Sequence, residues 1–330
     1  MTMNRRLLLP LLLLLAVLLP GCLEFDSQDV FLHYDPAQDQ LDLLFVYRGL
    51  HADTKGDQTR RIEEAVEHLE EAQQSGAFAF WSNYPWRLRP RHDRTHMQLL
   101  LPHLQVENGP LFKDADGRLC GYQLVRFSKV KKLLDKVNTV LSLMLETRVL
   151  TKGDWPLLPD HEVDDESRDR ITDFLRGRGQ VLRLRDACLE LRLPLSEPDS
   201  RWLREQVARS LLRDLLNELD RAKASEPNAE VRLFEQIART PTFQLLASQD
   251  VSWVREAGMT RLQLGVPGQP QQTLRSAAKG SYDPALLKAL EARKVAIGPE
   301  LTEAELLKRF GEFHGRAAVL PPELAAMAKK

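Results

Sequence analysis

Residues 30–47 read VFLHYDPAQDQLDLLFVY, and the fold can be predicted outward from this stretch. Its two runs of apolar and aromatic residues, Val30–Tyr34 and Leu41–Tyr47, are typical of β-strands. Between them, Asp35–Asp39 has the Asp and Pro residues that favour turns. The stretch therefore predicts an antiparallel β-hairpin.

The segment after this hairpin combines helical and strand patterns. An amphipathic helix is predicted over 59–74, where apolar residues recur at helical spacing. The elements expected next are strands over 97–101, 104–107 and 119–127, and a helix from Ser128, its N-cap, to Leu150. Residues 30–150 are therefore expected to form an α+β domain of antiparallel hairpins packed with helices.

Residues 151–166 contain two prolines and an acidic run, and they are predicted to be a linker. Residues 167–315 are expected to form a helix-rich α+β domain with a short hairpin around Asp186, since residues 180–193 alternate apolar and polar side chains. The other elements expected here are helices over 167–176, 200–223, 230–238 and 241–248, a strand over 260–266, and helices starting at Asp283 and at the capping box Thr302–Glu305. Residues 316–330 are expected to be a loosely held tail.

The composition excludes several classes of protein. The chain has 330 residues, of which 43% are hydrophobic, and its formal net charge at pH 7 is −1. This length suffices for about two domains with their own cores. The hydrophobic content argues against a disordered chain. Because the charges nearly cancel, nucleic acid is not expected as a partner.

The N-terminus has the pattern of a secretory signal. Arg5 and Arg6 precede Leu7–Leu19, an apolar run that contains Pro10. A basic start followed by a short apolar run is typical of signal peptides. The run is short for a membrane-spanning helix, which needs about 20 apolar residues. Residues 1–21 are therefore predicted to be a signal peptide.

The end of this run, Leu19-Pro20-Gly21-Cys22, resembles the lipobox of bacterial lipoproteins. The resemblance implies that a peptidase cuts before Cys22, and that acyl chains on Cys22 hold the protein to membrane lipid in the cell envelope. Because Leu23 rather than Asp follows, it also implies delivery to the outer membrane, facing the periplasm. Residues 22–29 are expected to be a tether with about 25 Å of reach. An ordinary signal peptide or a short membrane anchor is the alternative.

Two further cysteines, Cys120 and Cys188, remain after Cys22. In an oxidising envelope compartment they could form a disulfide. They could equally be two buried thiols, since free cysteine is often buried. Both interpretations stay open at the level of the sequence.

Aromatic residues crowd the segment 78–86, and arginines follow directly. We name as the aromatic patch Phe78, Phe80, Trp81, Tyr84, Trp86, Arg87, Arg89 and Arg91. Such a surface could place its rings among lipid headgroups and its arginines on lipid phosphates. It could also bind a glycan or an envelope protein. Core aromatics beside a solvated basic edge explain the same residues.

Three motifs weakly resemble catalytic or metal sites. Ser128 and Lys131 have the spacing of the acylating motif of penicillin-binding proteins, but the partner motifs are missing. His92 and His96 lack the Glu of a zinc-protease motif. Asp114–Gly117 lacks the closing Glu of a calcium loop and is typical of a hairpin turn. No catalytic residue, metal or cofactor is predicted from these motifs.

The sequence therefore favours a membrane-anchored envelope protein with an interaction or structural role. The alternative is an envelope hydrolase or another envelope-modifying enzyme whose site residues are scattered along the chain.

Overall fold

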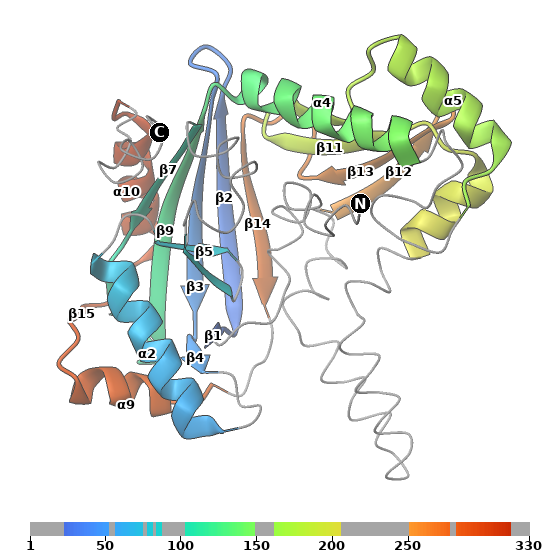
Figure 1. The fold of residues 1–330 in the computed structure, drawn as a ribbon. Coiled ribbons are helices and arrows are strands. Elements are labelled where there is room, and N and C mark those ends of the chain that lie inside the picture. The colour runs from blue at the N-terminus through green and yellow to red at the C-terminus, as the bar shows by residue number, and fades with distance from the viewer. Residues whose placement is uncertain are drawn as a thin grey trace, which may run out of the picture.

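The computed structural model describes residues 23–52, 57–74, 78–81, 84–87, 103–148, 162–205, 251–277 and 282–317. The predicted α+β class is confirmed. Seven strands of these residues form one large sheet, which is mainly antiparallel (Figure 1). Across the sheet, the order is β14 (Gln271–Ala277), β2 (Ser27–Asp35), β3 (Gln40–Arg48), β9 (Leu119–Ser128), β8 (Leu111–Lys113) and β15 (Ile297–Gly298), and β7 (Leu104–Asn108) also pairs with β9.

The hairpin predicted from residues 30–47 is confirmed as β2 and β3, in the interior of this sheet. In the turn between β2 and β3, the Asp35 carboxylate accepts hydrogen bonds from the backbone N–H groups of Ala37 and Gln38 at 2.8 and 3.1 Å. Asp39 completes the turn with a left-handed φ of 53°, a conformation that Asp tolerates better than most residues. The local turn chemistry thus sets the register of the two central strands.

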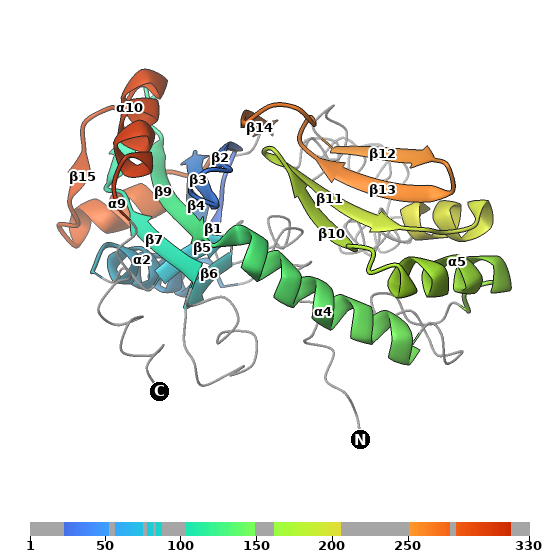
Figure 2. The same ribbon diagram turned by 90° about the horizontal axis from the view of Figure 1, so that it is seen from above.

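Helices cover both faces of the large sheet, as the view from above shows (Figure 2). The helices α2 (Gln58–Gln74) and α9 (Ala285–Ala292) pack on one face, and α10 (Glu303–His314) packs on the other. Because side chains alternate along a strand, Phe45 of β3 belongs to the first core and Leu44 to the second. β3 is therefore buried on both faces.

A smaller four-stranded sheet follows, in the order β10 (Leu182–Arg185), β11 (Cys188–Leu193), β13 (Met259–Leu264) and β12 (Val251–Glu256). Its core includes side chains of α4 (Val130–Arg148), α5 (Asp165–Arg176) and the helical segment 197–205. The side chain of Asn138 in α4 exchanges two hydrogen bonds, of 2.7 and 2.8 Å, with the backbone of Leu182. This exchange joins α4 to β10.

The chain returns from the smaller sheet to the larger one. β14 pairs with β2 along its whole length, from Gln271↔His33 to Ala277↔Ser27. The elements after it, α9, β15 and α10, also belong to the large sheet and its two cores. The sequence assigns residues 271–315 to a second domain, whereas the structure inserts the smaller sheet between α4 and β14. Of the expected linker, residues 151–161 lie outside the described residues, and α5 begins at Asp165.

Most of the other predicted elements that fall on described residues are present in the structure. α2, β7, β9, α5, the hairpin around Asp186 and the capping box at Thr302 are confirmed. The sequence does not predict β1, β4, β8 and β15, which are only two or three residues long, or β14, which is mostly polar, and it also misses β12. The expected elements at 97–101, 206–223, 230–238 and 241–248 lie outside the described residues.

The start of α4 differs from the prediction. Ser128 does not cap the helix, since its hydroxyl donates to the His103 carbonyl at 3.3 Å. Instead, the Asp39 carboxylate accepts the backbone N–H of Lys131 at 3.0 Å, and the Asp39 carbonyl accepts that of Val130 at 3.1 Å. One turn residue therefore serves both the β2–β3 hairpin and the helix. None of the helices in the described part of the chain is long and apolar enough to cross a membrane.

Candidate functional site

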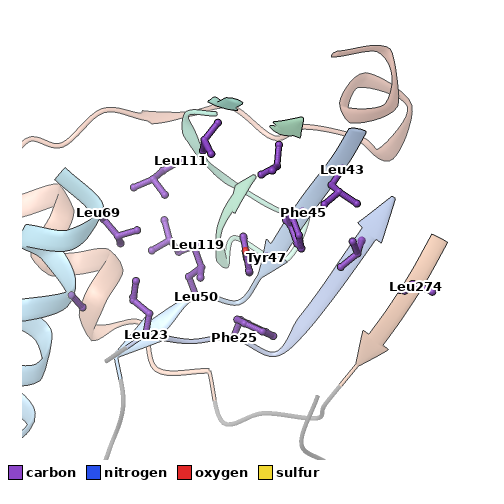
Figure 3. Packing of buried hydrophobic residues seen from close by; sticks show 14 of the residues in the cluster. Leu23, Phe25, Leu43, Phe45, Tyr47, Leu50, Leu69, Leu111, Leu119 and Leu274 are labelled. Carbon is purple, nitrogen blue, oxygen red and sulfur yellow. The ribbon is translucent and has the colours of Figure 1, made fainter. Parts of the chain in front are cut away.

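The first described residue, Leu23, already belongs to the folded core. β1 (Leu23–Glu24) pairs with β4 (His51–Ala52), so that Leu23 lies opposite Ala52. Leu23 is only 1% exposed, and it belongs to the same apolar cluster as Leu50 and Leu69 (Figure 3). The chain thus enters the fold at its first described residue.

The burial of these first residues corrects the prediction of a tether over residues 22–29. The side chains of Phe25 and Asp26 are each 5% exposed, and β2 begins at Ser27. A segment that is buried and paired over most of its length cannot act as a flexible spacer. Cys22 and the predicted signal peptide lie outside the described residues, and Cys22 directly precedes Leu23 in the sequence.

Charged side chains surround the start of β1. His51 Nε2 lies 3.4 Å from Glu24 Oε2, and His51 Nδ1 lies 2.8 Å from the Gly49 carbonyl oxygen. Burial alone would lower the pKa of His51, but its contacts with Glu24 and Gly49 outweigh burial and raise this pKa. Burial raises the pKa of Asp26, although the neighbouring His51 and Arg118 charges act to lower it. The pKa values of His51 and Asp26, both beside β1, are therefore raised for different reasons.

A second polar cluster lies beside the C-terminal end of α10. Asp42 and Arg126 face each other across β3 and β9, and both side chains are fully buried. Arg126 donates to the two Asp42 carboxylate oxygens at 2.8 and 3.1 Å. It also donates to the main-chain carbonyls of Phe313 and His314, at 2.6 and 3.2 Å. The ion pair therefore fastens α10 to the sheet.

Two histidines complete this cluster. His314 Nδ1 lies 2.7 Å from Asp42 Oδ2, and the His314 ring stacks on His33 with 3.9 Å between the centroids. Burial, and then the charge of His314, lower the pKa of His33. A carboxylate that orients an imidazole is a feature of general-base sites. Among the described residues, however, no Ser, Thr or Cys side chain hydrogen-bonds to either imidazole.

Sequence reasoning missed this cluster, although a signal was present. Asp42 is the one charged residue in the apolar run 41–47, and Arg126 interrupts the apolar end of β9. A charge inside a buried strand indicates a buried partner. Which residues form the pair is decided by the strand register, because Asp42 and Arg126 are 84 positions apart.

The aromatic patch predicted from residues 78–91 falls partly on a two-stranded hairpin. β5 (Phe78–Trp81) pairs with β6 (Tyr84–Arg87), and β5 lies beside α2 and β7. The side chains of this hairpin, and the whole of Arg89 and Arg91, lie outside the described part of the chain. The structure thus supplies the hairpin on which most of the patch residues lie.

Cys120 and Cys188 are buried free thiols. Cys120 belongs to β9 of the large sheet and Cys188 to β11 of the smaller one. Burial raises the pKa of each thiol to about 11. Since the thiolate is the reactive form, both side chains are poor nucleophiles near neutral pH.

A groove lies between the helical segment 197–205 and the strand β12. We call it the Trp253 groove, and its lining residues are Glu197, Ser200, Arg201, Arg204, Trp253, Val254, Arg255 and Thr260. Its volume is about 230 Å³. Sequence reasoning missed it because its two walls are about fifty positions apart in the chain.

The part of the chain that the structure describes contains no candidate metal site. No group of three or more His, Cys, Asp or Glu side chains there could hold a metal ion. Asp114, in the motif compared with a calcium loop, instead makes a hairpin turn: its carboxylate accepts the backbone N–H groups of Asp116 and Arg118 at 3.1 and 2.9 Å.

The chain was compared with known proteins. It matches no protein-family model, no curated protein and no solved structure.

Proposed function

We propose that this protein is a cell-envelope lipoprotein, held to membrane lipid by acyl chains on Cys22, with an interaction or structural role. The lipobox-like sequence Leu19-Pro20-Gly21-Cys22 supports the anchor. This motif is the observation that carries the proposal, and the buried position of Leu23 directly after Cys22 sets how close the folded body would lie to the anchor.

In this proposal the anchor also positions the protein. Acyl chains on Cys22 begin one residue before Leu23, whose backbone pairs with Ala52 of β4. No spacer separates the lipid from β1, whose Leu23 packs in the core beside the large sheet, so the folded body lies directly against the bilayer. Because Leu23 is not Asp, we propose the outer membrane, with the body facing the periplasm.

The partner that we propose is an envelope protein or a glycan, bound through the aromatic patch. A lipid-anchored body meets its partners at the membrane surface, and aromatic and arginine side chains dominate many interfaces. The position of β5 beside α2 supports this proposal, since it attaches the hairpin to the same body as Leu23.

An envelope hydrolase has less support. The contact of 2.7 Å between His314 and Asp42 is the arrangement closest to catalytic geometry in the described residues. Asp42 is also bound to the buried Arg126, which fastens α10. A structural role accounts for all of these contacts.

The anchor is tested by Cys22→Ser in the full chain, expressed in a Gram-negative host. The variant should lose incorporation of labelled palmitate and leave the membrane pellet after a carbonate wash. Cys188→Ala, which keeps Cys22, is the matched control and should stay in the pellet. If the Cys22→Ser protein remained bound to membranes after the wash, the lipid-anchor proposal would be wrong.

The interaction role is tested by exchanging Trp81 and Trp86 for Ala. Partners would be recovered by crosslinking in intact cells and identified after solubilising the envelope in detergent. We expect crosslinked products to disappear while the protein keeps its melting temperature. A loss of folding would instead assign both rings to the core.

A further inference from the structure

The Trp253 groove has the features of a binding site for a small anion. The helical segment 197–205 forms one wall, and Trp253 and Arg255 of β12 form the other. Its volume of about 230 Å³ is below the range of about 300–1,000 Å³ that drug-sized ligands occupy. The groove is therefore suited to a ligand of about one ring with a charged substituent.

The charge of the groove is positive. Three arginines line it, Arg201, Arg204 and Arg255, against the single carboxylate of Glu197. Glu197 forms an exposed ion pair with Arg201 at 3.2 Å. Within the described residues, neither Arg204 nor Arg255 forms an ion pair with an acidic side chain. Two guanidinium groups from opposite walls thus remain available to an anion.

The floor of the groove adds a hydrogen-bond donor. Thr260 Oγ1 donates to Ser200 Oγ at 2.8 Å, and both residues are buried. Because Ser200 Oγ accepts this bond, its own hydroxyl hydrogen stays available to a ligand. Trp253 is partly exposed and supplies a flat apolar surface beside the two polar residues.

We propose that the Trp253 groove binds a phosphate group carried on a single polyol or sugar ring. Arg204 and Arg255 bind the phosphate, because guanidinium groups form paired, charge-assisted hydrogen bonds with phosphate oxygens. The ring lies on Trp253, and one of its hydroxyls accepts the hydrogen bond from Ser200. This site does not depend on the lipid anchor or on the aromatic patch. Its ligand chemistry has two sources, a soluble sugar phosphate and the headgroup of an anionic phospholipid.

The test measures binding to the full mature chain in neutral detergent micelles by isothermal titration calorimetry. The probes are glucose 6-phosphate, inorganic phosphate and glucose. We expect glucose 6-phosphate to bind more tightly than inorganic phosphate, and glucose to bind weakest. The double variant Arg204→Gln/Arg255→Gln should raise the Kd for glucose 6-phosphate at least tenfold, and higher salt should weaken binding in the parent protein.

The control is Arg183→Gln. Arg183 is also exposed, but it lies on β10, at the opposite edge of the smaller sheet. This variant should keep the parent Kd. Because all three arginines are exposed, we expect the melting temperatures of both variants to match that of the parent protein.

A second arm separates the two sources of phosphate. Micelles are doped with phosphatidylinositol, whose phosphate carries a polyol ring, or, as a control, with phosphatidylcholine. If the ligand is a lipid headgroup, phosphatidylinositol should compete with glucose 6-phosphate in the parent protein. If the ligand is soluble, it should not compete. Either result supports the site, provided that the Arg204→Gln/Arg255→Gln variant loses the binding. An unchanged Kd in this variant, or no binding of any phosphate probe at millimolar concentration, would overturn the proposal.

Discussion

Asp42 and Arg126 lie opposite each other in β3 and β9, with neither side chain exposed to solvent. Their pairing does more than join two strands, because Arg126 also donates to the carbonyls of Phe313 and His314. Carbonyls in the last turn of a helix have no partner within the helix. A single guanidinium group therefore neutralises a buried carboxylate and completes the C-terminal end of α10.

Arg126→Met should be among the most destabilising substitutions in the chain. It removes the guanidinium group from the buried Asp42 carboxylate, and removing one partner of a buried ion pair typically costs about 3–5 kcal/mol. Urea unfolding measures the loss, and Lys308→Met, at an exposed position of α10, is the control. The double variant Asp42→Asn/Arg126→Met should recover part of the stability, since both charges of the buried ion pair are then removed. A loss no larger than that of Lys308→Met would contradict the structural role.

Leu23→Ala should destabilise the protein by about 2–5 kcal/mol, the usual cost of truncating a buried leucine. The reason is that Leu23 belongs to the core cluster of the large sheet. Leu307→Ala is the matched control, because Leu307 is 40% exposed. Urea unfolding measures the loss of stability in both variants. Equal effects would mean that β1 behaves as a flexible tether after all.

Asp39→Ala should cost about 1–2 kcal/mol, because it removes the cap of α4 and puts Ala at a positive φ. Asp39→Asn should cost only a few tenths of the free energy that Asp39→Ala costs, since Asn accepts the same hydrogen bond and tolerates the same φ. Thermal unfolding measures both. If Asn were as costly as Ala, the carboxylate charge rather than the cap would explain the effect.

The contribution of His51 to stability should depend on pH. Contacts with Glu24 and Gly49 raise the pKa of His51 in the folded state above its ordinary value of 6.5. The folded protein therefore holds this proton more tightly than the unfolded chain does. The resulting stabilisation is fully present below the unfolded pKa, and it is lost as the pH rises through the folded pKa.

The measurement compares the unfolding free energies of the parent protein and His51→Gln at about pH 5.5 and about pH 8.5. The unfolding free energy of the parent protein should exceed that of His51→Gln by more at the acidic pH than at the alkaline pH. Glu24→Gln is the control, because it removes the carboxylate that raises the pKa. An advantage that grew toward alkaline pH would reverse the predicted sign.

Cys120 and Cys188 should resist alkylation in the folded protein. Their pKa values of about 11 leave little thiolate at neutral pH, and both side chains are fully buried. Mass spectrometry should find both sites unmodified by iodoacetamide under native conditions and fully modified in urea. Resistance in urea that disappears after reduction would instead identify a disulfide.

The elements with local sequence signals could be predicted before the structure. The β2–β3 hairpin follows from two apolar runs around the Asp35–Asp39 turn, and the start of α10 follows from the Thr302–Glu305 capping box. α2 and β9 can be predicted in the same way, since a periodic pattern depends only on residues within a few positions of one another.

Which distant segments meet, by contrast, becomes visible in the folded protein alone. Among the side chains of β14 that the structure describes, Leu274 is the one buried apolar residue, and β14 is stabilised as a strand by its pairing with β2. The partners of Asp42, the walls of the Trp253 groove and the burial of Leu23 likewise depend on register and packing between segments far apart in the chain. Such contacts gain their free energy only when the whole fold forms, so local patterns could not reveal them.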